Sequence, residues 1–168
     1  ALHALENDPA LRPLVSKLVT NGTPHQGIRV GASDKITKAI QRFWLTPPGV
    51  RDLLITSPVS AKIKSGWEDA LRGMVELDPS FRAHSVASRT FRTDHDSLVP
   101  VHSAWLHGDS DYVTNYLTEG GHSLNLAFGR HDSANFRTLM AAYGSNDPAH
   151  HAAAAQAHAT SQAWAATR

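Results

Sequence analysis

Two stretches of this chain combine residue types that can support nucleophilic and acid–base chemistry. The first, residues 26–33, is a glycine-bounded loop that leads into a predicted helix over 36–43. The N-terminus of a helix presents free backbone N–H groups and a partial positive charge. These lower the pKa of a thiol placed there and can hold an oxyanion. The side-chain amide of Gln26, at the start of the loop, is a candidate for a second oxyanion donor.

The second stretch places a histidine directly after two glycines. Residues 120–122 are Gly-Gly-His, and a predicted strand begins at the histidine. A second predicted strand over 136–143 ends shortly before Asn146 and Asp147. A carboxylate or amide in that position can orient the imidazole of His122 and fix its tautomer, as an activated nucleophile requires.

The order and spacing of these residues resemble the papain-like cysteine peptidases, especially their compact staphopain-like and bacterial effector branch. Members of that family have a Gln-Gly pair, a short glycine-ended loop, the nucleophilic cysteine at the start of a central helix, and later a Gly-His strand followed by an Asn or Asp. Here Gln26 precedes Ala32 by six residues, and His122 follows Ala32 by 90. Asp147 lies another 25 residues on. The resemblance covers three short stretches of the chain.

This chain departs from the family because it contains no cysteine. Ala32 occupies the position of the nucleophile if the spacing from Gln26 is the guide. Ser33 occupies it if the guide is a Gly-x-Cys pattern, which residues 31–33 would otherwise satisfy. Replacement of the cysteine by alanine or serine silences such an enzyme, so the resemblance fits both an engineered inactive form and a natural pseudoenzyme.

The resemblance implies an acyl transfer, most simply the hydrolysis of a peptide bond. In the active family the cysteine at position 32 or 33 would attack the acyl carbon, with His122 as general base and then acid. Asp147 or Asn146 would orient His122, and Gln26 with a backbone N–H would stabilise the oxyanion. Asp132 is a less favoured orienting residue, because it lies in the middle of the predicted hairpin turn.

The same resemblance implies a protein or peptide substrate and no cofactor. It also implies a bacterial toxin or effector that is secreted and delivered into a host cell. Two other functions stay open. A domain with such a cleft can bind a partner without catalysis, and another class of enzyme matches part of the pattern.

That other class is the mono-ADP-ribosyltransferases, which use NAD. The chain has the order of residues that resembles their site, with Arg29, then Ser57, then Glu119. In that family the Arg and Ser organise the NAD site and the Glu activates the acceptor. The chain lacks the first acidic or amide residue of the paired element, because Leu117 stands there.

Eleven histidines raise the question of a metal site. Imidazole and carboxylate are possible metal ligands, but the chain has no HExxH motif or other closely spaced ligand pair. Histidines and aspartates in surface turns account for most of these residues, so no metal is predicted. The residues considered are Asp94, His95, Asp96, His102, His107, Asp109, Asp111, His131, Asp132, His150 and His151.

Composition limits the partners of the chain. Its 168 residues are 41% hydrophobic and 18% charged, enough for one domain with a buried core. The formal charge of +1 gives no basic footprint for nucleic acid. The longest apolar runs are too short to cross a membrane. The chain starts at Ala1, which suggests a processed or excised fragment.

Periodicity predicts that helices come first and strands later, and therefore an α+β fold. Together with the resemblance, this gives a papain-like fold with an N-terminal helical lobe and an antiparallel sheet. One domain is expected over 1–148, and the Ala-rich segment 149–168 is expected to form a peripheral helix or tail. The predicted helices cover 8–19, 36–43 and 65–77, the predicted strands cover 83–91, 98–106, 122–128 and 136–143, and one or two helical turns are allowed over 112–117.

Overall fold

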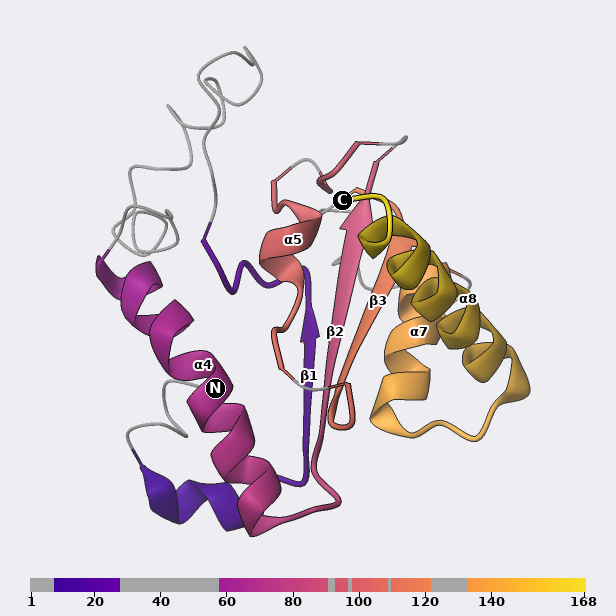
Figure 1. The fold of residues 1–168 in the computed structure, drawn as a ribbon. Helices are drawn as coiled ribbons and strands as arrows, with labels where there is room; N and C mark the ends of the chain where they lie inside the picture. Colours follow the sequence, from indigo (N-terminus) through magenta and orange to yellow (C-terminus); the bar gives the residue numbers. More distant parts are fainter. Residues whose placement is uncertain (1–7, 28–57, 91–92, 97, 109, 122–132) are drawn as a thin grey trace.

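The fold is described by a computed structural model that covers residues 8–27, 58–90, 93–96, 98–108, 110–121 and 133–168. These residues form a short parallel sheet with helices packed against it (Figure 1). In chain order the elements are the 3₁₀ helix η1 (Pro9–Leu14), β1 (Lys17–Asn21), α4 (Pro58–Leu77), β2 (Arg82–Arg89), α5 (Val101–Ala104), β3 (Val113–Glu119), α7 (Ala134–Tyr143) and α8 (Pro148–Ala165).

The three described strands lie in the order β1-β2-β3, and both neighbouring pairs are parallel. Lys17 of β1 is in register with Arg82 of β2, and Ala83 of β2 with Val113 of β3. Parallel strands need long crossover connections, usually with a helix. The chain supplies α4 before β2 and α5 before β3, so all three carboxyl ends lie at the same edge of the sheet.

Helices cover both faces of this sheet (Figure 1). On one face, Leu71 and Met74 of α4 pack against Ala83 of β2 in a buried apolar cluster. On the opposite face, Val86 of β2 packs in a second cluster with Ala157 of α8, and α7 contributes to the same cluster. The result is a three-layer α/β arrangement, in which β2 is buried along most of its length, as expected for a strand covered on both sides.

The predicted fold class is therefore wrong. The helices do not form an N-terminal lobe, and the described strands do not form an antiparallel sheet. Helices alternate with strands along the chain, and this alternation produces a parallel sheet because a crossover helix returns the chain to the same end. The papain-like architecture is excluded for the described residues.

The main local error is the segment predicted as a strand over 136–143, which is the helix α7. Ser133 caps its N-terminus by accepting a hydrogen bond from the Phe136 N–H at 3.1 Å. Gly144 ends it with φ of 103°, a left-handed conformation that glycine adopts without strain. The expected hairpin partner, 122–128, lies outside the described residues.

Other elements also differ from the predictions. The helix expected over 8–19 is divided into η1 and the strand β1. The strand expected over 98–106 is a loop with the short helix α5, and the helical turns allowed over 112–117 are replaced by β3. The predicted strand over 83–91 largely coincides with β2, and the helix over 65–77 forms the later part of α4. The helix predicted over 36–43 lies outside the described residues.

Most of the Ala-rich segment lies in α8, which packs on α7 and β3. Its small side chains Ala154, Ala157 and Ser161 are buried, so this helix approaches the sheet closely. Among the helices that the structure describes, none has the length and apolar character needed to cross a membrane.

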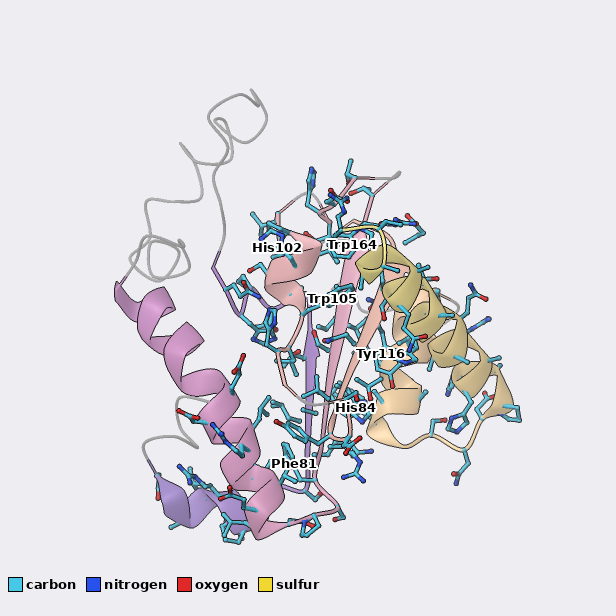
Figure 2. The ribbon with its side chains drawn as sticks, viewed as in Figure 1. Phe81, His84, His102, Trp105, Tyr116 and Trp164 are labelled. Carbon is cyan, nitrogen blue, oxygen red and sulfur yellow. The ribbon has the colours of Figure 1, made fainter. Side chains whose placement is uncertain are left out.

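Phe81 is the largest fully buried side chain of the described core, and it lies between α4 and the sheet (Figure 2). Replacing it with alanine removes the ring and leaves a cavity, so we expect Phe81→Ala to lower the free energy of unfolding by about 3–5 kcal/mol. Urea denaturation measures this change. Leu77→Ala is the control, because Leu77 is 57% exposed and its loss is expected to cost less than about 0.5 kcal/mol. Equal losses in both variants would contradict this description of the core.

Candidate active site

The carboxyl edge of the parallel sheet is the natural place to look for a site. In open α/β sheets, ligands bind in the crevice outside the carboxyl ends of the strands. Here three chain segments leave that edge: the loop after β1, the loop between β2 and α5, and the glycines after β3. The loop between β2 and α5 carries the most unusual side chain among the described residues of the edge.

Asp96 is this side chain, and only 1% of it is exposed. An aspartate is almost never fully buried unless its carboxylate is paired. Its Oδ1 accepts hydrogen bonds from the Leu98 N–H at 3.0 Å and the Val99 N–H at 2.7 Å. The backbone N–H of Asp96 donates to the Val99 carbonyl at 3.2 Å and closes the turn. Asp96 is therefore a buried acid held in a tight loop at the carboxyl edge.

The glycines after β3 lie against this loop. The Gly120 N–H donates to the carbonyl of Arg89, the last residue of β2, at 2.8 Å. A Cβ atom built on Gly121 would lie 3.9 Å from the carbonyl oxygen of Asp96 and 4.0 Å from the Thr90 side chain. Residue 121 thus contacts the backbone of the buried acid. The next residue in the chain is His122, whose own placement lies outside the described residues.

A buried polar network joins the strands just below these loops. Asn135, in the first turn of α7, is 1% exposed. Its amide donates to Asn21 at 3.2 Å, Ser88 at 3.3 Å and Thr118 at 3.4 Å, one residue from each strand. Ser88 and Thr118 also bond to each other at 3.0 Å. This network fixes the start of α7 on the carboxyl ends of all three strands.

The loop after β1 contains Gln26, the predicted oxyanion donor. Its Nε2 donates to the His102 carbonyl at 3.0 Å and also bonds to the ring of His107. Its backbone N–H donates to the Ser103 hydroxyl at 3.3 Å. The described contacts of Gln26 therefore attach the β1 loop to the region around α5.

The predicted orienting residues Asp147 and Asn146 lie elsewhere. Asp147 caps α8, because its Oδ1 accepts the Ala149 N–H at 2.8 Å, and Asn146 is exposed. The turn that holds them lies at the amino edge of the sheet, since a Cβ on Gly144 would lie 3.7 Å from the Nζ atom of Lys17, the first residue of β1. Gln26 follows the opposite end of β1. The structure therefore does not bring Gln26 and Asp147 together.

Asp147 does meet a histidine in this turn. The ring Nδ1 of His150 bonds to the Ser145 hydroxyl at 2.7 Å, and its Nε2 lies 3.7 Å from Asp147 Oδ2. The second distance is too long for a hydrogen bond. The Ser145 hydroxyl also accepts the Asp147 N–H at 3.2 Å. These contacts hold the turn between α7 and α8, which is the role that they support.

The remaining candidates are only partly described. Glu119, from the alternative transferase pattern, ends β3 and accepts a hydrogen bond from Arg89 Nε at 2.7 Å. The described residues contain no group of three or more side chains suited to hold a metal ion. The other candidates lie outside the described residues: Ala32 and Ser33 for the nucleophile, His122 and Asp132 for its partners, and Arg29 and Ser57 for the transferase.

Comparison with models of protein families, with curated proteins and with solved structures finds no match to this chain.

From the sequence alone, Asp96 is considered only as a possible metal ligand, and its burial beside Gly121 is not predicted. A usable signal was present. Asp96 comes shortly after the strand predicted over 83–91, and Gly-Gly-His follows shortly after the next described strand. Had these two strands been expected to be parallel neighbours, their carboxyl ends would have placed the acid and residue 121 side by side.

Two histidines near the ends of the sheet, the buried His25 and the partly buried His84, affect stability. Burial, with a further contribution from His107, lowers the pKa of His25 to about 3, and the His25 ring bonds to the Thr20 hydroxyl at 3.1 Å. Burial, with the charges of Lys17 and Arg82, lowers the pKa of His84 to about 4. Both rings are therefore neutral in the folded chain at neutral pH.

We expect the free energy of unfolding to fall as the pH decreases from about 6.5 to about 3. In this window the unfolded chain protonates these histidines and the folded chain does not, so protons favour unfolding. His25→Gln removes one such group and should reduce the loss by about 1–4 kcal/mol. Urea denaturation at several pH values measures it. His151→Gln, at an exposed position, is the control, and an unchanged pH dependence in His25→Gln would contradict the assignment.

Proposed function

We propose that this chain carries the acid and the histidine of an acyl-transfer hydrolase, with Asp96 as the residue that orients His122. The observation that carries the proposal is the contact between Gly121 and the backbone of Asp96. His122 is the next residue in the chain after Gly121, so it directly follows this contact in the sequence. In this proposal Asp96 takes the role that was predicted for Asp147 or Asn146.

The topology supports this reaction class. In α/β-hydrolases the acid and the histidine of the triad follow the nucleophile in the order nucleophile, acid, histidine. Here Asp96 follows β2 and His122 follows β3, and these two strands are parallel neighbours whose carboxyl ends share one edge. In this proposal the catalytic roles belong to a parallel sheet between helices and not to the papain-like fold, which is excluded for the described residues.

The chemistry requires three groups with defined roles. His122 would take the proton of the nucleophile and return it to the leaving group, and the carboxylate of Asp96 would fix its tautomer and stabilise the imidazolium. Ser33, one of the two positions predicted for the nucleophile, precedes Asp96 in the chain as this order requires. Peptide-bond hydrolysis stays a proposal within this reaction class.

The turn and the proposed orienting role make different demands on residue 96. The two described side-chain hydrogen bonds of the turn run from backbone N–H groups to Oδ1, and an asparagine Oδ1 can accept the same bonds. The orienting role needs a negative charge. Asp96→Asn therefore separates the two roles, since the loop is expected to keep its shape while the imidazole loses its anionic partner.

We expect the pKa of His122 to be lower in Asp96→Asn than in the unaltered chain, because a nearby carboxylate favours the charged imidazole. Proton-detected NMR titration of the histidine rings measures this, with His122→Gln identifying the resonance among the eleven histidines. Hydrolysis of p-nitrophenyl acetate, followed in the same variant, is expected to fall by roughly 10⁴-fold, as for other triads whose aspartate becomes asparagine.

Asp147→Asn is the matched control, because it makes the same chemical change at the opposite edge of the sheet. It is expected to leave the pKa of His122 unchanged, because Asp147 caps α8 at that edge. A response of His122 to Asp147→Asn and not to Asp96→Asn would overturn the proposal and restore the assignment made from the sequence.

A further inference from the structure

The C-terminal end of α8 is attached to the loop that carries Asp96. Asp94 lies two residues before Asp96 in this loop, and its Oδ1 accepts a hydrogen bond from Trp164 Nε1 at 3.2 Å. Its Oδ2 forms an ion pair with the guanidinium of Arg168, four residues from Trp164. Trp164 and Arg168 thus bind the two carboxylate oxygens of Asp94, which lies 70 or more positions before them in the sequence.

Apolar packing strengthens the same contact. The rings of Trp164 and Trp105 meet edge to face with centroids 4.9 Å apart, close to the end of α5 (Figure 2). Arg168 lies over the Trp164 ring, with its Cζ 4.8 Å from the centroid. Trp164 also packs against the buried cluster that contains Val99 and Val101. An isolated surface ion pair contributes little, but this one is combined with an indole hydrogen bond and a shared apolar cluster.

The held loop is the one that shapes the proposed acid. The carbonyl of Asp94 accepts the Val101 N–H at 2.8 Å, and the next carboxylate along the chain, Asp96, accepts the Leu98 and Val99 N–H groups. A displacement of Asp94 would therefore reach Asp96 by two routes. One is the backbone of His95, which lies between them, and the other is the hydrogen bond between the Val101 N–H and the Asp94 carbonyl.

We propose that Trp164 and Arg168 form a C-terminal clamp that holds the Asp96 loop through Asp94, which makes Asp94 a positioning residue for the site. The positioning role of Asp94 rests on the proposed function, because it takes Asp96 as the partner of His122. The attachment of the loop by Trp164 and Arg168 does not depend on the proposed function. A change at Trp164 or Arg168 would then alter the Asp96 loop without touching Asp96 itself.

Hydrogen exchange of the Val99 amide tests the clamp, since this N–H donates directly to Asp96 Oδ1. We expect Asp94→Ala to increase its exchange rate by about tenfold or more, through local opening of the loop. Asp94→Asn keeps an acceptor for Trp164 and loses the ion pair, so it is expected to give a smaller increase. Asp69→Ala, which breaks the exposed ion pair with Arg72 on α4, is the control and should leave Val99 unchanged.

The pKa of His122, measured in Asp94→Ala, tests whether Asp94 positions the site. A contact that only holds the loop would leave this pKa unchanged. We expect it to move in the same direction as in Asp96→Asn. Unchanged exchange at Val99 in Asp94→Ala would overturn the clamp. If exchange increases while His122 does not respond to Asp96→Asn, the clamp stands and the proposed function fails. If His122 responds to Asp96→Asn but not to Asp94→Ala, Asp94 is no positioning residue.

Discussion

The parallel pairing of β2 between β1 and β3 is the constraint on which the rest of this structure depends. A strand with a parallel neighbour on each side needs helical crossovers, and its faces must then be covered by helices. Because β2 carries Ala83, Val86 and Ala87 toward opposite faces, each helical layer finds an apolar surface to pack against. The same pairing collects three strand ends at one edge, where the described polar residues Asp96 and Asn135 are buried.

Burying these polar side chains costs free energy, and their hydrogen bonds to neighbouring side chains and to the backbone offset that cost. Burying an amide or a carboxylate without partners is unfavourable by several times the gain from a typical hydrogen bond. Asn135 therefore bonds to all three strands, and Asp96 takes two backbone N–H groups. Such groups tolerate little displacement, so they fix the loops above them. Hydrogen-bonded polar groups therefore join the described loops of this edge to one another and to the strands.

Local pattern was sufficient for elements with one strong signal and insufficient for the others. The later part of α4 repeats apolar residues at helical spacing, and β2 is a short run of mostly small residues around Val86. In α7, the apolar run over 136–143 is also compatible with a strand, and periodicity cannot separate the two over so few residues. The deciding features were its ends, Ser133 as a cap and Gly144 as a left-handed stop. Ser133 instead lies within the predicted hairpin turn, and Gly144 carried no prediction.

The candidate site shows why spacing in sequence is a poor substitute for topology. Asp147 and Asp96 are both about 25 residues from His122, one after it and one before it. The resemblance favoured the later residue, since an antiparallel hairpin would return the chain to His122. In a parallel sheet the chain returns instead through a crossover, so the neighbour of residue 121 comes from the loop after the preceding strand. The direction of β3 thus decides which acidic residue lies beside residue 121, and this direction depends on packing between β3, β2 and the helices that cover them rather than on the local sequence.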